Sequence, residues 1–299
     1  MRYRPMGASG AIVSAVSLSL EPDPGRPRAS DWVSFLYAAL ENGISTLVVS
    51  AADPVVLDGL AEALASVDRR LVFLALRLGG GPGVARDFSP HGLSAQITSV
   101  LARTGAHYLD AVLLEEPGAD EVSAGALLAL EQLKARGAIN FLGVSGEGDP
   151  IDEHLTTGFF DLLAMPFNIT SGWRERNRLR SAGASDVSVL GYRSYPRDFH
   201  AAVLAADHKP AARTRKNPLA GRGSYAFLDA TPGWTPEEIG LSYALTEPSL
   251  ASVLVTVGDA DHLARLAAVT EREMPPGLAA QIEMARFTPG LEGLARQSA

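Results

Sequence analysis

The sequence contains no cysteine, which excludes disulfide bonds, thiolate nucleophiles and metal sites built on cysteine ligands. No apolar run approaches the ~20 residues that a membrane helix needs. The opening MRYRPMGASG also lacks the apolar core of a signal peptide. We therefore expect a cytoplasmic protein with no membrane-spanning segment.

Positive charge is in short supply, with 26 Lys and Arg against 34 Asp and Glu and a net charge of −8. Such a chain has no general attraction for nucleic acid or for an anionic membrane, so neither is an expected partner. The six histidines include no pair at the i, i+4 spacing of a helix-borne metal site, and we predict no metal.

What the chain does contain is an alternation of short apolar runs and amphipathic helical stretches, which is typical of βαβ units. Strands of a parallel sheet are buried on both faces and read as continuous apolar runs. Eight runs fit this description: Ala15–Leu20, Thr46–Val49, Leu71–Arg77, Ala111–Leu114, Asn140–Val144, Leu162–Met165, Val187–Gly191 and Ser252–Thr256.

The segments between these runs carry helix signals. Val33, Leu36 and Leu40 share one helical face, and Ser89–Pro90 and Thr235–Pro236 are typical helix starts. The pattern predicts an α/β fold, a (β/α)₈ TIM barrel that occupies residues 1–299 as one domain. Before the first strand, an N-terminal β-hairpin of residues 2–6 and 11–13 is expected to plug one end of the barrel.

One stretch interrupts the alternation. Residues 208–223 read HKPAARTRKNPLAGRG and are polar, basic and rich in Pro and Gly. They predict a long flexible loop, whose basic side chains are also candidates to grip an anionic ligand.

Six segments, taken in chain order, carry a family resemblance: RYRPMGASGAIVSAVSL, LENGISTLVVSAAD, SPHGLSAQITSVLARTGAHYLDAVLLEEP, LEQLKARGAINFLGVS, MPFN and WTPEEIGLSYALTEPSLASVLV. They are similar to successive helices and strands of the aldo-keto reductase family. The resemblance runs over nearly the whole chain.

This resemblance implies an NADPH-dependent carbonyl reductase whose Asp, Tyr, Lys and His tetrad lies at the C-terminal mouth of the barrel. In that family Tyr donates the proton, Lys and Asp lower its pKa, and His orients the carbonyl. The four positions fall here on Val48, Asp53, Arg77 and Glu115. The chain therefore resembles a degenerate member that lacks the tetrad.

The cofactor positions of the family are also altered. Its Ser–Asn pair becomes Ser145–Gly146, while Asn168 matches a family asparagine and Tyr192 stands where some members stack an aromatic ring on the cofactor. The phosphate loop becomes residues 256–259, and the added carboxylate of Asp259 is expected to repel phosphate. The resemblance thus implies either no cofactor or NADP in a weakened site, with Asn168, Ser145 and Tyr192 as candidate contacts.

The candidate site consists of polar residues at strand C-termini, because active sites of this fold form there. The candidate catalytic residues are Glu115, Asp53, Tyr192 and Arg77, and the candidate ligand-binding residues are Arg193, Asn168, Ser145 and Glu116.

Each candidate also has a structural interpretation. Arg77 and Glu115 come from adjacent strands and can form a buried ion pair. Asp53 before Pro54 is a typical helix cap. An aromatic residue such as Tyr192 at a strand end often serves packing.

Three hypotheses follow. The preferred one is a barrel repurposed for non-redox chemistry, of lyase, dehydratase, cyclase or isomerase type, or for binding a polar small molecule at its mouth. The second is an NAD(P)H-dependent oxidoreductase with a relocated proton donor. The third is a catalytically silent regulatory or scaffold subunit with a protein partner. The sequence does not identify a substrate, because the same fold serves many different reactions.

Overall fold

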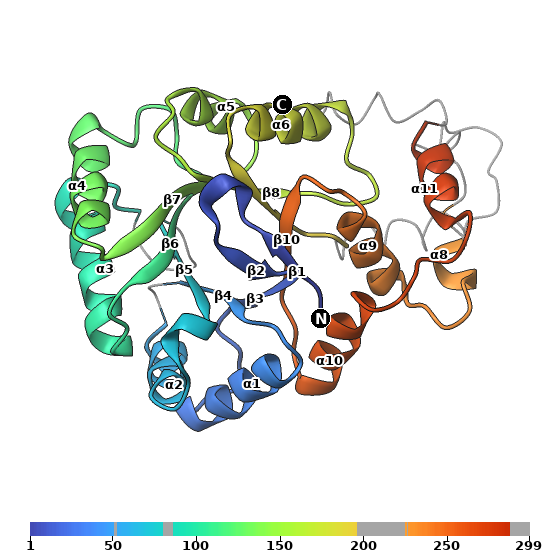
Figure 1. The fold of residues 1–299 in the computed structure, drawn as a ribbon, viewed down its shortest axis with the longest axis horizontal. Coiled ribbons are helices and arrows are strands. Elements are labelled where there is room, and N and C mark those ends of the chain that lie inside the picture. Colours follow the sequence, from blue (N-terminus) through green and yellow to red (C-terminus); the bar gives the residue numbers. More distant parts are fainter. Residues whose placement is uncertain (51–52, 80–85, 196–224, 226, 288–299) are drawn as a thin grey trace, which may run out of the picture.

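The protein is described by a computed structural model that covers residues 1–50, 53–79, 86–195, 225 and 227–287. Eight parallel strands close into a barrel in the order β10-β3-β4-β5-β6-β7-β8-β9 (Figure 1). This confirms the predicted fold. The basic segment 208–223 lies outside the described residues, as do residues 288–299, so the assignment of the whole chain to one domain stays a prediction.

The barrel strands follow the predicted apolar runs closely. They are β3 (Val16–Leu20), β4 (Thr46–Ser50), β5 (Phe73–Leu78), β6 (Leu109–Glu115), β7 (Ile139–Ser145), β8 (Leu162–Pro166), β9 (Ser188–Tyr192) and β10 (Leu250–Val255).

The predicted start of β5 at Leu71 is wrong. Residues Arg69–Leu71 form the short 3-10 helix η2, because the Asp68 carboxylate accepts a hydrogen bond from the backbone N–H of Arg70 at 3.0 Å. Leu71 is consequently 67% exposed, and the strand begins two residues later at Phe73.

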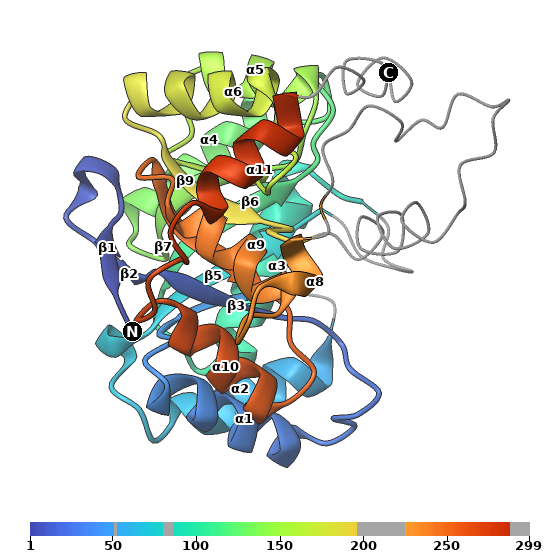
Figure 2. The same ribbon diagram turned by 90° about the vertical axis from the view of Figure 1, so that its right-hand side faces the viewer.

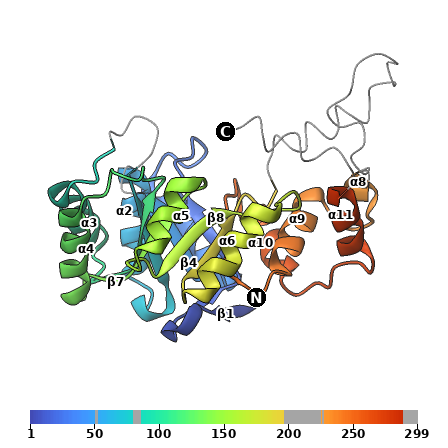
Figure 3. The same ribbon diagram turned by 90° about the horizontal axis from the view of Figure 1, so that it is seen from above.

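Helices surround the barrel (Figures 1 and 3). They are α1 (Ala29–Glu41), α2 (Pro54–Leu64), α3 (Pro90–Thr104), α4 (Ala124–Ala135), α5 (Asp149–Thr156), α6 (Trp173–Ala184), α8 (Phe227–Ala230), α9 (Pro236–Leu245), α10 (Ala260–Val269) and α11 (Leu278–Phe287). None of these described helices combines the length and the apolar character that crossing a membrane demands.

The helix caps follow the sequence signals. Ser89 caps α3, and Thr235 with Glu238 forms a capping box on α9. Figure 2 faces the flank on which α9, α10 and α11 lie. There the Tyr243 hydroxyl donates to the Glu283 carboxylate at 2.5 Å and joins α11 to α9.

The N-terminal hairpin is present and closes the N-terminal end of the barrel. Strands β1 (Tyr3–Pro5) and β2 (Ile12–Ser14) pair antiparallel around the 3-10 turn η1 (Gly7–Ser9). Met6 and Val13 are fully buried and pack with the inward-facing residues of the barrel. The hairpin therefore fills the N-terminal end of the barrel with apolar side chains, whereas the C-terminal end stays open.

The barrel interior changes character along its axis because side chains alternate between the two faces of a strand. The apolar layer includes Ala75 of β5, Leu113 of β6 and Leu190 of β9. Two residues further along each of these strands stand Arg77, Glu115 and Tyr192. The sequence therefore places a polar layer directly above the apolar core, at the C-terminal mouth.

The hairpin plug makes a testable contribution to stability. Met6→Ala is expected to lower the free energy of unfolding by about 2 to 5 kcal/mol, since it empties a fully buried volume. Ile12→Ala, on the same hairpin but 66% exposed, should change it by no more than about 0.5 kcal/mol. Urea unfolding measures both, and equal effects would show that the hairpin does not act as a plug.

Candidate functional site at the barrel mouth

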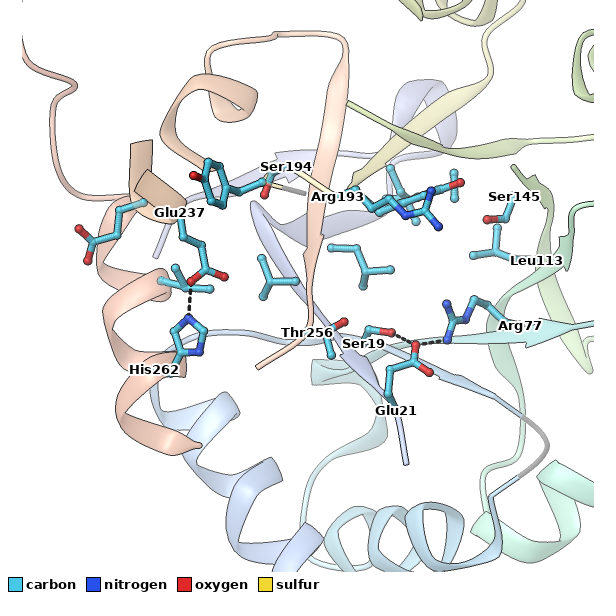
Figure 4. A pocket seen from close by; sticks show the side chains of 18 of the residues that line it. Ser19, Glu21, Arg77, Leu113, Ser145, Arg193, Ser194, Glu237, Thr256 and His262 are labelled. Atoms are coloured by element: carbon cyan, nitrogen blue, oxygen red, sulfur yellow. Dashed lines mark hydrogen bonds and ion pairs between the residues drawn. The ribbon is translucent and has the colours of Figure 1, made fainter. Parts of the chain in front are cut away.

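A cavity of about 1000 Å³ opens at the C-terminal mouth of the barrel (Figure 4). Six of the eight predicted site residues line it: Arg77, Glu115, Glu116, Ser145, Tyr192 and Arg193. Asp53 and Asn168 are not among the lining residues. The structure thus brings together most of the residues that the strand ends predicted.

Arg77 lies between two carboxylates. Its guanidinium donates a hydrogen bond to the Glu21 carboxylate, and its Nη1 is 3.8 Å from Oε1 of Glu115. The Glu21 carboxylate also accepts from the Ser19 hydroxyl at 2.6 Å (Figure 4). The ion pair expected between Arg77 and Glu115 is therefore present, but Arg77 lies closer to Glu21 than to Glu115.

Glu21 is a site residue that the sequence analysis missed. It directly follows the predicted strand Ala15–Leu20, so the rule that selected the other candidates would have selected it as well. With Glu21 included, two carboxylates face one guanidinium, and the group carries a net negative charge.

Glu115 is the least engaged of these charges. Within the described residues, no group donates a hydrogen bond to its carboxylate, and Arg77 is its one ion-pair partner there. Burial raises the pKa of Glu115; Glu21 and Glu116 add to this rise, and Arg77 opposes it. A carboxyl group in this position can hold a proton at a pH where an exposed one has lost it.

Two hydroxyl groups beside Glu115 also face the cavity. Ser145 lies opposite Glu115 in the pairing of β6 with β7 and is 6% exposed. Burial, together with the carboxylates of Glu147, Glu116 and Glu115, raises the pKa of Tyr192 to about 12. Neither hydroxyl has a hydrogen-bond partner among the described residues.

Two of the loops that follow these strands are held in the left-handed backbone region. Glu116 has φ 47° and Arg193 has φ 52°, values that cost a residue with a side chain about 1 to 3 kcal/mol. Each comes directly after an inward-facing residue of the mouth, Glu115 or Tyr192. Of the three described residues other than glycine with positive φ, these two lie at the mouth, and the third, Asp186, precedes β9.

Asn168 maintains one of these turns. Its side-chain amide donates to the carbonyl of Arg193 at 3.2 Å, and its Oδ1 accepts from the backbone N–H of Thr170 at 2.9 Å. With both ends of the amide engaged, Asn168 contributes to loop geometry outside the lining of the cavity. The Arg193 guanidinium is partly exposed at the edge of the cavity and lies 3.4 Å from the Glu147 carboxylate.

Asp53 and Val48, the other two positions that the family resemblance assigned to a tetrad, have structural contacts. Asp53 caps α2 by accepting from the N–H groups of Val55 at 2.8 Å and Val56 at 3.1 Å, which confirms its structural interpretation. Val48 is fully buried in the apolar layer of the barrel. A carboxylate in place of Val48 would be surrounded by hydrocarbon.

A second polar group lines the cavity on the side of α9 and α10. His262 Nε2 is 2.7 Å from Oε2 of Glu237 (Figure 4). Arg265 of α10 also lines the cavity. The sequence alone does not reveal this pair, because its members are 25 residues apart and meet only through the packing of α9 against α10.

The loop between β10 and α10 is the place where the family resemblance puts the phosphate of NADP, so its contacts decide whether a phosphate fits there. Asp259 accepts from the N–H of His262 at 2.7 Å, so the chain's own carboxylate occupies the N-terminus of α10. That N–H lowers the pKa of Asp259. Arg26 donates to the carbonyls of Gly258 at 2.7 Å and Val257 at 3.2 Å.

A helix N-terminus attracts anions through its free N–H groups. Here the position is filled from within, and the nearest buried guanidinium is committed to backbone carbonyls and to Asp23 at 2.7 Å. The described residues of this loop therefore do not fit a dinucleotide phosphate.

The raised pKa of Glu115 predicts a pH-dependent effect on stability. The fold disfavours the ionised carboxylate, so it loses stability as the pH rises through the pKa of Glu115 in the folded state. Glu115→Gln should raise the free energy of unfolding at neutral pH and leave it unchanged at about pH 3, where both states are protonated. Urea unfolding across this range is the measurement; the exposed Glu131→Gln is the control, and an equal gain there would contradict the assignment.

The strained turn at Glu116 gives another prediction. Glu116→Gly should exceed Glu116→Ala in free energy of unfolding by up to about 1 kcal/mol, because only glycine adopts the left-handed region without a steric penalty. Both variants lose the same carboxylate, so their difference reports the backbone alone. If Ala proves as stable as Gly, the turn is not strained.

Comparison with known proteins adds family information. The Aldo/keto reductase family model matches residues 24–286. The holo form of the aldo-keto reductase AKR11C1 from Bacillus halodurans superposes with a TM-score of 0.76 at 19% identity, covering 97% of both chains. Its apo form gives a TM-score of 0.71 at the same identity and coverage. A search of curated proteins found no match. At this identity the structural likeness shows the fold.

Proposed function

The chain belongs to the aldo/keto reductase family, and we propose that it binds a small polar molecule at the barrel mouth and acts on it by proton transfer, without hydride transfer. The observation that carries this proposal is Glu115, a half-buried carboxyl group with a raised pKa and no hydrogen-bond donor among the described residues. It faces a cavity large enough for a small molecule.

The chemistry assigned to the site is that of a lyase or an isomerase. Glu115 removes a proton from the bound molecule and returns it to another atom of that molecule or to a leaving hydroxyl. Arg77 stabilises the ionised form of Glu115, and its pairing with Glu21 fixes its position. The Tyr192 hydroxyl stays protonated at neutral pH and donates a hydrogen bond to an oxygen of the ligand.

Two observations argue against hydride transfer. A general acid works best with a pKa near the working pH, whereas Tyr192, the nearest candidate for a relocated donor, has a pKa raised to about 12. The carboxylate of Asp259 also occupies the helix end where the family's phosphate loop lies.

Two further observations argue against a silent subunit. The mouth is open, since a cavity of about 1000 Å³ remains beside the pair of Arg77 and Glu115. Backbone strain at Glu116 and Arg193 lowers stability, and such strain is typical of sites where geometry serves function. A scaffold whose mouth had no role would gain stability by relaxing both turns.

The first experiment titrates the protein with NADPH and with NADH and follows the fluorescence of its three tryptophans. We expect no saturation at millimolar concentration. Saturation in the micromolar range, together with carbonyl reduction that Tyr192→Phe abolishes, would overturn the proposal in favour of an oxidoreductase.

The second experiment tests proton transfer directly. A panel of small hydroxy, keto and amino compounds is incubated with the protein in D₂O, and proton NMR follows the loss of carbon-bound protons and the appearance of new products. Exchange or conversion should occur with at least one compound and should vanish in Glu115→Gln but persist in Glu131→Gln. Activity that survives in Glu115→Gln would remove Glu115 from the role of base.

A further inference from the structure

The lining of the mouth has an excess of negative charge. Three guanidinium groups face the cavity, and they belong to Arg77, Arg193 and Arg265. Five carboxylates face it, and they belong to Glu21, Glu115, Glu116, Glu237 and Glu238. Arg272, which is not a lining residue, lies 3.2 Å from the Glu238 carboxylate, so a difference of one negative charge remains. The carboxylates come from the end of β6, the loops after β3 and β6, and α9, so no single helix or loop accounts for the difference.

The guanidinium groups are poorly placed to bind an anion. Arg77 already lies between Glu21 and Glu115, and an anion would have to displace a carboxylate to reach it. Arg193 is 61% exposed and lies 3.4 Å from Glu147. An anionic ligand would enter a region whose nearest charges are carboxylates.

Independent evidence that a ligand belongs here comes from Ser145. This residue is more than nine-tenths buried, faces the cavity, and has no hydrogen-bond partner for its hydroxyl among the described residues. Its hydroxyl opens onto the cavity, where a ligand can supply the missing hydrogen-bond partner. Its neighbour across the strand pairing is Glu115, whose carboxylate has no donor there either.

Together these groups define a recognition pattern. Building on the proposed function, we propose that the ligand is a small hydroxylated amine, which binds with its ammonium group among the carboxylates of Glu115, Glu21 and Glu116 and a hydroxyl group at Ser145. The ammonium group supplies the donors that Glu115 lacks.

This placement has a consequence for the pH dependence of binding. The groups that act on Glu115 are the guanidiniums of Arg77 and Arg86, the carboxylates of Glu21 and Glu116, and the phenol of Tyr192. A cation beside Glu115 favours its ionised form, so binding releases a proton wherever that carboxyl is protonated in the free protein. Affinity for the amine therefore rises with pH until Glu115 is fully ionised.

The test compares three probes with the same three-carbon skeleton: serinol, which carries an ammonium group, glycerol, which is neutral, and glycerate, which carries a carboxylate. Calorimetric titration of the full chain at neutral pH is expected to show serinol binding at least about tenfold more tightly than either of the others. Glu115→Gln should remove this preference, whereas Glu131→Gln, which loses an equal charge on the outer face of α4, should keep it.

Circular dichroism establishes that both variants are folded, and Ser145→Ala supplies a second variant that keeps every charge. It should weaken serinol binding by about five- to tenfold if the hydroxyl contact exists. Equal or tighter binding of glycerol or glycerate, or no binding of serinol, overturns the hydroxylated amine as the ligand. The proposed function fails separately, through saturable NADPH binding with carbonyl reduction.

Discussion

The closure of the sheet between β10 and β3 is the constraint on which the mouth depends. Between these two strands the backbone N–H of Val253 donates to the carbonyl of Ala15 at 2.9 Å, and small polar side chains form further hydrogen bonds. The hydroxyls of Ser17 and Ser252 are 2.7 Å apart, and Ser252 also donates to the carbonyl of Ser14 at 2.7 Å. A closed barrel has no free edge, so the direction of every inward side chain is fixed by its place along its strand.

The residues at the four positions that the family resemblance assigned to a tetrad have different surroundings in the structure. Val48 fills the apolar layer, Asp53 caps α2, and Arg77 pairs with Glu21. Glu115 is the exception, because it keeps a raised pKa and has no hydrogen-bond donor among the described residues. Val48 and Asp53 support the fold, whereas Arg77 and Glu115 belong to the charged group on which the proposed chemistry depends.

The fold could be read from the sequence because a parallel sheet buried on both faces leaves a strong signal. Continuous apolar runs located all eight barrel strands, and turn and cap residues located the helices between them. The failure at Leu71 has a local cause, since an apolar residue in a capped 3-10 turn looks like the first residue of a strand. Polar residues at the C-terminal ends of strands also predicted most of the cavity lining. Glu21 directly follows β3 and met the same criterion, but it was not among the candidates.

Other features of the site depend on tertiary packing and left no local pattern. The pair of Glu237 and His262 joins two helices, and the strain at Glu116 and Arg193 is a property of backbone angles. Asn168 matched a family position by residue type, yet its amide is engaged within the loops that follow β8 and β9. Residue type predicts which atoms are available, whereas packing decides what they contact.

The carboxylate of Asp259 at the N-terminus of α10 can be regarded as a permanently bound competitor. A tethered group is present at an effective concentration set by the chain and does not dilute when the protein does. A free anion that binds at this helix end must displace the Asp259 carboxylate. The affinity of that anion is therefore reduced, because the carboxylate already occupies the position. A free anion is therefore at a disadvantage at this helix end, whatever the protein concentration.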